Sequence, residues 1–307
     1  MTEVALGLAA LGRPGYLNLG HGEDLGDHRS VEALRRRTHE VLDAAYQAGV
    51  RYYDAARSYG RAEEFLGAWL DARAIEPGTV TVASKWGYTY TAGWQVDADP
   101  PEVKDLSLAQ LRRQLAETRA LLGPWLSLYQ IHSATASSGV LDDEAVLAEL
   151  AGLRERGLAI GLSVSGTEQA VTVERAVDRG GFDTVQATFN LLEREAGPAL
   201  ERAHATGMRV IVKEAVANGR LTARGECAPL EAVARRLGAP SDAVAIAWVM
   251  ARPWVDVALS GAATIEQLSS NLAATRIEWR PDLDEELAAL AEPTERYWST
   301  RSDLPWT

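Results

Sequence analysis

The sequence predicts an α/β fold, a (β/α)8 TIM barrel in which outer helices surround a closed parallel sheet. Short apolar runs alternate with longer amphipathic patterns along the whole chain, and this alternation is typical of parallel strands joined by crossover helices. Eight such units in a chain of 307 residues suit one closed barrel. An open doubly wound sheet is the alternative, but it favours a G-x-G-x-x-G turn that does not follow the first predicted strand.

Each predicted strand is a short run rich in Val, Ile, Leu or Ala. The predicted strands are residues 4–9, 50–54, 80–85, 126–132, 159–164, 184–188, 209–213 and 255–259. The predicted helices are residues 31–48, 61–74, 106–122, 142–156, 167–179, 196–206, 230–237 with 242–250, 265–275 and 282–291. No linker or low-complexity segment interrupts this order, so we expect a single barrel domain over residues 1–307.

Two connections are longer than ordinary loops, and the chain ends in an aromatic tail. Loops of such length in compact domains are usually functional or disordered, and their aromatic residues argue against disorder. We therefore expect segments 18–30 and 86–105 and the C-terminal tail 292–307 to lie at or near the barrel mouth. The alternative is that their rings merely plug the mouth. The aromatic residues concerned are Trp86, Tyr88, Tyr90, Trp94, Tyr297, Trp298 and Trp306.

The composition excludes several classes of function. The chain has 31 Lys and Arg against 43 Asp and Glu, a formal charge of −12, which repels nucleic acid and anionic membranes. Any anionic ligand must then be held by local groups. Cys227 is the only cysteine, which excludes an internal disulfide and fits a reducing cytoplasm. No apolar run reaches the about 18 residues of a membrane span, and no signal peptide is evident, so we expect a cytoplasmic protein.

Four polar residues fall at corresponding ends of three neighbouring predicted strands. Asp54 ends the second strand and Tyr59 follows in its loop, while Lys85 and His132 end the third and fourth strands. The carboxyl ends of barrel strands form the catalytic face of this fold, so we expect these side chains to converge there. Each residue alone has a structural explanation, as a cap, a packing residue, a solvated charge or a core histidine. Together they predict an acid–base site.

These residues belong to motifs by which the sequence resembles the aldo-keto reductase family. The resemblance spans nearly the whole chain, and the spacing of the four residues is its most specific part. The matching motifs are Tyr53-Asp54-Ala55-Ala56, Tyr59-Gly60, Glu63-Glu64-Phe65-Leu66-Gly67, Ala83-Ser84-Lys85-Trp86-Gly87, Tyr129-Gln130-Ile131-His132-Ser133, Ile160-Gly161-Leu162-Ser163, Gln186-Ala187-Thr188-Phe189-Asn190-Leu191-Leu192 and Ser260-Gly261-Ala262 with Gln267, Leu268 and Asn271.

The resemblance implies an NAD(P)H-dependent oxidoreductase that reduces an aldehyde or ketone to an alcohol. Tyr59 would be the general acid that protonates the carbonyl oxygen, and a nearby Lys85 ammonium would lower its pKa from about 10. Asp54 would pair with Lys85, and His132 would orient the substrate oxygen. Two alternatives remain open: a purely structural Lys85–Asp54 ion pair, and a barrel that has lost its reaction.

The resemblance also implies a nicotinamide dinucleotide bound across the barrel mouth, with its phosphates at the helix after the eighth strand. The N-terminus of that helix offers unpaired N–H groups, and Thr264 would cap it. The resemblance implies NADPH as the first choice of cofactor. NADH follows closely, because Gly261 and Gln267 stand where many relatives carry basic residues for the 2′-phosphate, which weakens the selectivity for NADPH. Arg220, in the loop after the seventh strand, would reach the pyrophosphate. The alternative is that Arg220 is a loop arginine exposed to solvent. The predicted cofactor contacts are Ala9, Ala10, Ser163, Gln186, Lys213, Arg220, Ser260, Gly261, Ala262, Thr264, Gln267 and Asn271.

Two positions near the expected nicotinamide depart from the family pattern. Val164 stands where the family usually has an amide residue after strand five, and the following Ser165 would take over its hydrogen bond. Lys213 stands where an aromatic ring usually stacks on the nicotinamide. A lysine cannot stack like a ring, and the adjacent Glu214 would pair with it. We therefore expect the nicotinamide geometry to differ from that of typical members.

The predicted substrate-binding residues are Trp86, Tyr88, Trp94 and Trp298, whose rings suit an apolar or sugar-ring face. The expected partner is a small-molecule carbonyl compound. Two other functions fit the same residues: an NAD-dependent aldose dehydrogenase, and a redox-inert NADPH-binding sensor. A metal-dependent hydrolase is discounted, because the five histidines show no H-x-H or H-E-x-x-H spacing.

Overall fold

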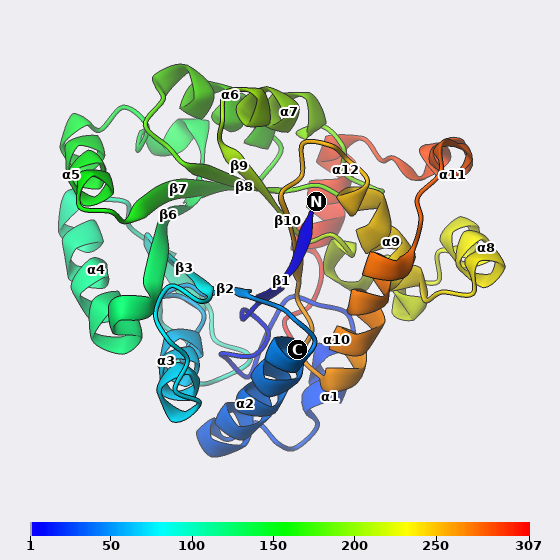
Figure 1. The fold of residues 1–307 in the computed structure, drawn as a ribbon, viewed down its shortest axis with the longest axis horizontal. Helices are drawn as coiled ribbons and strands as arrows, with labels where there is room; N and C mark the ends of the chain where they lie inside the picture. Colours follow the sequence, from blue (N-terminus) through cyan, green and yellow to red (C-terminus); the bar gives the residue numbers. More distant parts are fainter. Residues whose placement is uncertain (1) are drawn as a thin grey trace.

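The computed structural model describes residues 2–307 and confirms the predicted (β/α)8 barrel. Eight parallel strands close in the order β1-β10-β9-β8-β7-β6-β3-β2, and helices surround them (Figure 1). The barrel strands are β1 Glu3–Gly7, β2 Tyr52–Asp54, β3 Thr81–Trp86, β6 Leu126–Ala134, β7 Ala159–Val164, β8 Thr184–Thr188, β9 Arg209–Lys213 and β10 Val257–Ser260. The first strand pairs with the last, with Leu6 opposite Ser260, and this pairing closes the barrel.

The expected helices occur in the expected order, and α2, α4, α5 and α10 begin at polar side-chain caps. Ser30 Oγ accepts a hydrogen bond from Ala33 N at 3.2 Å, and Asp143 Oδ1 accepts one from Val146 N at 3.1 Å. Such caps satisfy N–H groups that a helix start leaves unpaired. The helices are α1 His21–Leu25, α2 Val31–Gln47, α3 Ala62–Ala72, α4 Leu108–Leu122, α5 Glu144–Glu155, α6 Gln169–Arg179, α7 Gly197–Ala205, α8 Ala228–Leu237, α9 Ser241–Met250, α10 Ile265–Leu272, α11 Pro281–Glu286 and α12 Thr294–Ser302.

Several predicted boundaries differ from the structure by a few residues, and the physical reason is plain for two of them. The first strand was expected over residues 4–9, but it ends at Gly7, because the chain turns there and Gly12 N donates to the Leu8 carbonyl at 3.0 Å. The helix expected over 282–291 ends at Glu286. The carbonyl of the next residue, Leu287, accepts a hydrogen bond from Arg194 Nη2 at 2.7 Å, and a 3-10 turn follows instead of further α-helix.

The hydrophobic core has an inner and an outer part. Because side chains alternate along a strand, one set from each strand fills the barrel and the other set packs against the helices. The inner set is Ala5, Tyr52, Ala83, Leu128, Ile211, Val257 and Leu259. These residues come from six of the strands and leave the carboxyl ends of the strands open for polar side chains.

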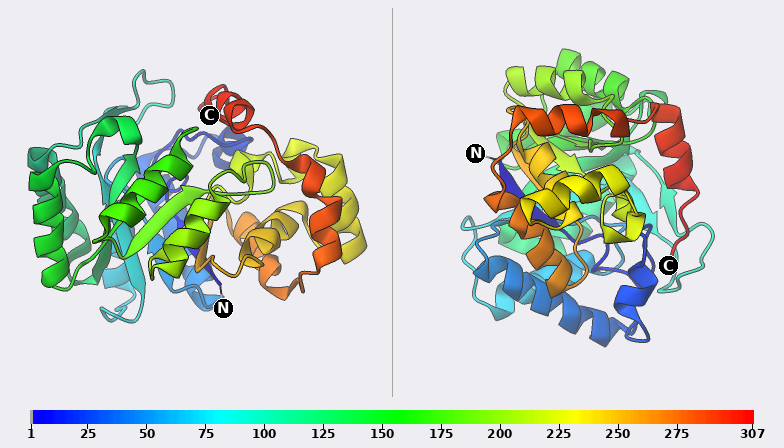
Figure 2. Two further views of the ribbon diagram at one scale, coloured as in Figure 1. Left: turned by 90° about the horizontal axis from the view of Figure 1, so that it is seen from above. Right: turned by 90° about the vertical axis from the view of Figure 1, so that its right-hand side faces the viewer.

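The two long connections and the tail form additional structure at one end of the barrel. Segment 18–30 contains α1, and segment 86–105 contains an antiparallel hairpin of β4 Tyr88–Tyr90 and β5 Glu102–Lys104. Figure 2 shows the loop of this hairpin and α12 on one side of the barrel, with the N-terminus on the opposite side. The chain end is fixed there, because Tyr16 N donates to the Thr307 carbonyl at 3.2 Å.

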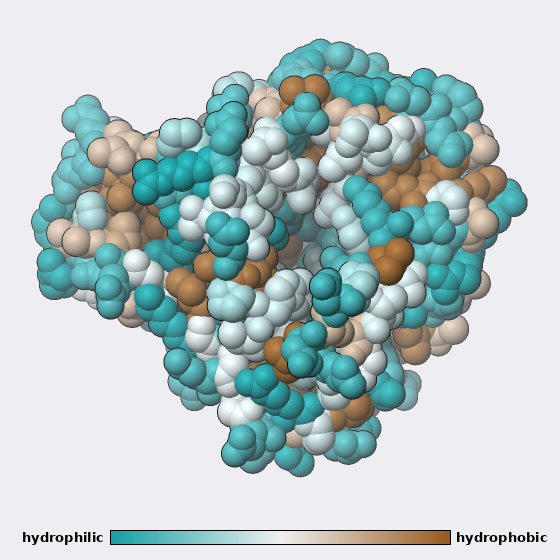
Figure 3. Space-filling view, turned by 180° about the vertical axis from the view of Figure 1, so that it is seen from behind, coloured by the Kyte–Doolittle hydropathy of each residue, from teal (hydrophilic) through white to brown (hydrophobic). Residues whose placement is uncertain are grey.

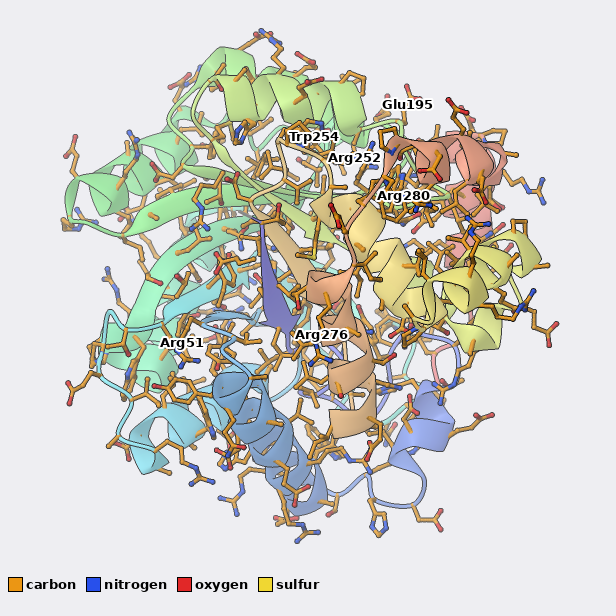
Figure 4. The ribbon with its side chains drawn as sticks, turned by 45° about the vertical axis from the view of Figure 1, so that its right-hand side comes forward. Arg51, Glu195, Arg252, Trp254, Arg276 and Arg280 are labelled. Carbon is orange, nitrogen blue, oxygen red and sulfur yellow. The ribbon has the colours of Figure 1, made fainter. Side chains whose placement is uncertain are left out.

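The segment between α9 and β10 packs against α11 and against the residue that follows β8. Arg252 and Trp254 lie side by side before β10 (Figure 4). Arg252 pairs with Asp284 at 2.9 Å, and the Trp254 ring lies 4.9 Å from that of Phe189. Across residues 2–307, the helices are too short or too polar to cross a bilayer.

Candidate active site

The structure brings Asp54, Lys85, Tyr59 and His132 together at the carboxyl ends of β2, β3 and β6. Lys85 is fully buried and its Nζ donates directly to Asp54 Oδ2 and, at 3.0 Å, to the Ala55 carbonyl. Nζ lies 5.0 Å from the centre of the Tyr59 ring, and the His132 ring centre lies 5.5 Å from it at an angle of 83°. The phenol therefore lies between an ammonium group and an imidazole.

Further polar residues hold the Asp54 carboxylate in place. Its Oδ1 accepts hydrogen bonds from Gln130 Nε2 at 3.3 Å and from Gln186 Nε2 at 3.2 Å. Asp54 is 2% exposed, and a buried charge requires such partners. The carboxylate is thus fixed from two more strands, β6 and β8, and its geometry fixes that of Lys85.

The pKa of Tyr59 is shifted in the direction opposite to the one expected. Burial raises the pKa of Tyr59 far above its ordinary value, Asp54 raises it further, and Arg13 lowers it in part. The lowering expected from Lys85 is not found. The physical reason is that Lys85 is joined to Asp54, whose negative charge offsets the field of the ammonium at the phenol. The phenol is therefore protonated at neutral pH.

The imidazole of His132 is neutral. Burial lowers the pKa of His132 well below its ordinary value, and Lys85 and Arg13 lower it further. His132 Nδ1 lies 3.4 Å from Ser58 Oγ, and the Tyr88 ring centre lies 5.0 Å from the imidazole. A neutral imidazole can donate one hydrogen bond into the cavity without carrying a charge there.

A cavity of about 640 Å³ joins these residues to the start of α10. Viewed from behind, the surface is hollowed near its centre, and both polar and apolar residues border the hollow (Figure 3). Most residues expected to contact a cofactor line the cavity. These are Ala9, Ala10, Ser163, Gln186, Lys213, Ser260, Gly261, Ala262, Gln267 and Asn271.

Two residues expected at the cofactor do not line the cavity. Thr264 caps α10 as expected, accepting a hydrogen bond from Gln267 N at 3.2 Å. Arg220 points elsewhere, because its guanidinium forms an ion pair with Glu292 at 2.6 Å. The cavity arginine in this region is Arg224. No pattern in the sequence distinguishes Arg224 from Arg220, because only the conformation of the loop directs one of them to the cavity.

The end of the cavity beside α10 is rich in carboxylates. Asp24 binds Arg224 at 2.6 Å and accepts a hydrogen bond from Gln267 Nε2 at 2.7 Å. Asn271 Nδ2 donates to Asp242 Oδ2 at 2.6 Å. Among residues 2–307, Arg224 is the arginine that lines this end, and it is already paired with Asp24. The carboxylates of Asp24, Asp242 and Glu266 all line the cavity here.

The sequence suggested that Lys213 pairs with Glu214. The structure places Glu214 near Lys213, but the closest partner of Lys213 is Thr188. Lys213 Nζ donates to Thr188 Oγ1 at 2.6 Å and lies 3.9 Å from Glu214. Glu214 is instead bound through both oxygens by Arg301 of α12, at 2.5 to 3.0 Å. Burial lowers the pKa of Lys213 to about 8, although Glu214 raises it. A second buried charge cluster thus joins β9 to α12 at the cavity.

The residues expected to bind substrate do not line the cavity. Trp86 is fully buried, since it follows the inward Lys85 in β3 and alternation directs it toward the helices. Trp94 packs on Phe65, and Trp298 lies beside Arg301 and contributes to the α12 packing. Tyr88 contacts His132 from outside the cavity lining.

Other aromatic residues and one arginine take that place in the cavity. Tyr16, Trp306 and Arg13 line it together with Tyr59 and His132. Trp306 belongs to the aromatic tail that the sequence places near the mouth, so that signal was available. Arg13 and Tyr16 lie in the loop after β1, where no pattern in the sequence distinguishes them.

The lining also suits a nicotinamide dinucleotide. Asn218, in the loop after β9, lines the cavity, and its Nδ2 donates to the Leu17 carbonyl at 2.8 Å. Its Oδ1 is buried and has no hydrogen-bond partner among residues 2–307, although buried polar atoms normally have one. An acceptor without a partner in a cavity of this size fits a polar ligand with N–H or O–H groups.

Comparison with known proteins identifies relatives over most of the chain. The model of the "Aldo/keto reductase family" matches residues 19–292. The chain is 23% identical over 297 residues to the uncharacterized oxidoreductase YqkF of Bacillus subtilis, covering 87% of this chain and 90% of that protein. It is 27% identical over 204 residues to a D-threo-aldose 1-dehydrogenase of a Pseudomonas species, covering 61% of each.

A solved structure has the same fold. The aldo-keto reductase AKR11C1 from Bacillus halodurans, in its holo form, superposes with a TM-score of 0.72 at 20% identity, covering 94% of this chain and 92% of that one. Identity this low shows the fold alone, whereas the family model matches by sequence across most of the chain. By that match, the chain belongs to the aldo/keto reductase family of oxidoreductases.

Proposed function

We propose that the protein reduces an aldehyde or ketone to an alcohol with a nicotinamide dinucleotide, and that Tyr59 is the general acid. One observation carries the proposal: the Tyr59 phenol lines the cavity between the Lys85 ammonium and the neutral His132 imidazole. An acid, a group that stabilises its conjugate base and a hydrogen-bond donor for the substrate oxygen are what carbonyl reduction requires of the protein.

The bound dinucleotide supplies a hydride to the carbonyl carbon, and residues of this chain do the rest. Ser163 and Gln186 would hold the nicotinamide end, and Ser260, Gln267 and Asn271 the adenosine end. His132 would donate a hydrogen bond to the carbonyl oxygen and orient it. Tyr59, protonated because its pKa is raised, would deliver its proton to that oxygen. The Lys85 ammonium would then stabilise the phenolate that remains.

The charge at the α10 end supports NADH rather than NADPH as the preferred cofactor. The family resemblance alone favours NADPH. However, Arg224 already forms an ion pair with Asp24 at 2.6 Å, which neutralises its charge. The acidic residues Asp242 and Glu266 also line this end. A 2′-phosphate carries negative charge, which these carboxylates would repel, whereas a ribose hydroxyl could donate to Asp24.

Oxidation of a sugar by the same residues is the second candidate. The relative named D-threo-aldose 1-dehydrogenase supports it. In that direction Tyr59 would act as the base. Measuring both directions of turnover with both cofactors separates the two candidates, because a sugar dehydrogenase would oxidise aldoses faster than it reduces aldehydes at matched concentrations.

Cofactor titration followed by an aldehyde panel, with Tyr59→Phe as the key variant, tests the proposal. NADH is expected to quench tryptophan fluorescence at lower concentration than NADPH. Tyr59→Phe is expected to bind the cofactor normally and to lose about a hundredfold or more in kcat, the usual contribution of a general acid. Near-normal turnover by this variant would exclude the assigned role. Tight cofactor binding without reduction of any aldehyde would favour a redox-inert sensor.

A further inference from the structure

Arg13 is a buried arginine of the cavity that the reaction described above does not use. It comes from the loop after β1, and its side chain is 5% exposed. Its Cζ atom lies 5.4 Å from the ring centre of Tyr59, 5.3 Å from that of Tyr16 and 4.7 Å from that of Trp306. Aromatic rings therefore hold the guanidinium directly beside the proposed general acid.

The protein satisfies only part of this guanidinium. Nη1 donates to the Ser58 carbonyl at 3.2 Å and to Glu102 Oε2 at 3.1 Å. Nε is buried and has no hydrogen-bond partner among residues 2–307. A buried donor without a partner is unfavourable, so an acceptor at the edge formed by Nε and Nη2 would be stabilising. Carboxylates bind arginine at such an edge through two parallel hydrogen bonds.

Positive charge gathers around the reacting end of the cavity, although the whole chain carries −12. Besides burial, the cations Lys85, Arg13, Lys213 and Lys104 all lower the pKa of His132. Lys104 Nζ donates to a backbone carbonyl at 2.8 Å and forms no ion pair within the described part of the chain. The carboxylates of Asp54, Glu102 and Glu214 also lie at this end, and they form ion pairs with Lys85, Arg13 and Arg301. Within residues 2–307, the charge of Lys104 is not neutralised in this way, which favours a substrate with a negative charge near its carbonyl group.

We propose that the substrate is a short oxo acid, and that Arg13 binds its carboxylate while Tyr59 and His132 bind its carbonyl oxygen. This inference rests on the proposed carbonyl reduction and adds the chemical class of the substrate. The guanidinium lies only 5.4 Å from the Tyr59 ring centre. The carboxylate and the carbonyl group of the substrate are therefore separated by only a few bonds. Glu102 shares Nη1 and leaves the opposite edge to the substrate.

A structural role for Arg13 is the competing explanation. Its ion pair with Glu102 of β5 joins the loop after β1 to the hairpin, so substitution would disturb the cavity for every substrate. The two explanations differ in selectivity. Loss of a structural contact lowers the turnover of charged and neutral carbonyl compounds alike, whereas loss of a carboxylate contact lowers only that of the acid.

The test compares 4-oxobutanoate with its methyl ester, which differs mainly in charge. In the wild type, kcat/KM is expected to be at least about tenfold higher for the acid than for the ester, because one hydrogen-bonded contact between charged groups contributes about this factor. In Arg13→Gln the ratio of acid to ester is expected to fall by about tenfold or more. Arg51→Gln is the matched control, because Arg51 binds backbone carbonyls and the Tyr46 ring away from the cavity and its loss should leave the ratio unchanged.

Two further measurements separate failure of this inference from failure of the proposed function. Calorimetric binding of 4-oxobutanoate to the protein loaded with the oxidised cofactor involves no turnover, and it should weaken about tenfold in Arg13→Gln. Glu102→Gln removes the competing carboxylate and should tighten the binding. Reduction of both compounds with an unchanged ratio in Arg13→Gln would overturn the inference and leave carbonyl reduction standing. Equal binding of acid and ester by the wild type would also overturn it.

Discussion

Glu63 is a buried carboxylate that is hydrogen-bonded to β3, the strand that carries the proposed catalytic residue Lys85. It is 2% exposed. Its Oε1 accepts hydrogen bonds from Ser84 Oγ at 2.6 Å and from Thr118 Oγ1 at 2.8 Å, and its Oε2 binds Arg57 Nη1 at 2.5 Å. Ser84 precedes Lys85 in β3, so this network fixes the strand that carries the ammonium. Every oxygen of the carboxylate is thereby satisfied, as a buried charge requires.

Replacing Glu63 with Gln should therefore destabilise the fold. The substitution leaves the Arg57 charge without its closest partner, and breaking a largely buried pair costs about 3 kcal/mol. Urea unfolding followed by tryptophan fluorescence measures the loss. Glu64→Gln is the matched control, because the Glu64–Arg61 pair is 45% and 47% exposed and such pairs contribute less than about 1 kcal/mol. Equal losses in both variants would contradict this view of Glu63.

At the residue scale, the sequence predicts residues at strand ends better than residues in loops. Asp54, Lys85 and His132 lie in or at the ends of strands, so the barrel fixes where they meet. Arg13 and Arg224 depend on partners 89 and 200 residues away, Glu102 and Asp24. Their positions follow from loop conformations that no periodic pattern encodes.

Helix α12 is held on the barrel by charge as well as by apolar packing. Arg301 binds Glu214 at 2.5 Å, and the pair lies in a buried cluster with Lys213. Burial raises the pKa of Glu214, but Lys213 and Arg301 outweigh this and hold it at about 2. The carboxyl group therefore holds its proton less tightly in the folded protein than in the unfolded chain, so its ionisation favours folding.

This contribution should disappear in acid. A carboxyl whose pKa falls from its ordinary 4.5 to about 2 on folding stabilises the folded state by about 3 kcal/mol above pH 4.5. That stability is lost as the pH falls from about 4.5 toward 2. The difference in unfolding free energy between wild type and Glu214→Gln is thus expected to shrink over this window, and denaturation at several pH values measures it. A constant difference would show that Glu214 does not act through its charge.

At the element scale, the period of the sequence identifies the strands but not the direction of each aromatic residue. Strand β3 was expected with Lys85 at its end, and the alternation that turns Lys85 inward also turns Trp86 outward. Trp86 was nevertheless expected in the substrate site, because the aromatic rings of segment 86–105 suit an apolar or sugar-ring face. In the tail 292–307, Trp298 was expected to bind substrate but packs with α12. Trp306, which was not among the predicted substrate-binding residues, reaches the cavity instead.

For the whole molecule, barrel closure connects residues from the two ends of the chain. Strand β1 pairs with β10, where Leu6 lies opposite Ser260, and with β2, where Gly7 lies opposite Asp54. The inner core likewise draws on strands from Ala5 to Leu259. No half of the sheet is complete without the other, so we infer that residues 1–307 fold as one unit.

A single substitution in β1 tests this inference. Leu6 is fully buried, and Leu6→Ala should lower the unfolding free energy by about 2–5 kcal/mol, as cavity-forming substitutions do. If the barrel is one cooperative unit, hydrogen exchange should accelerate equally in the slowest-exchanging amides of β3, β6 and β9, because all of them exchange through global unfolding. Peptide-resolved mass spectrometry measures each strand separately. Acceleration confined to β1, β2 and β10 would show instead that the barrel opens in parts and that closure does not couple its two halves.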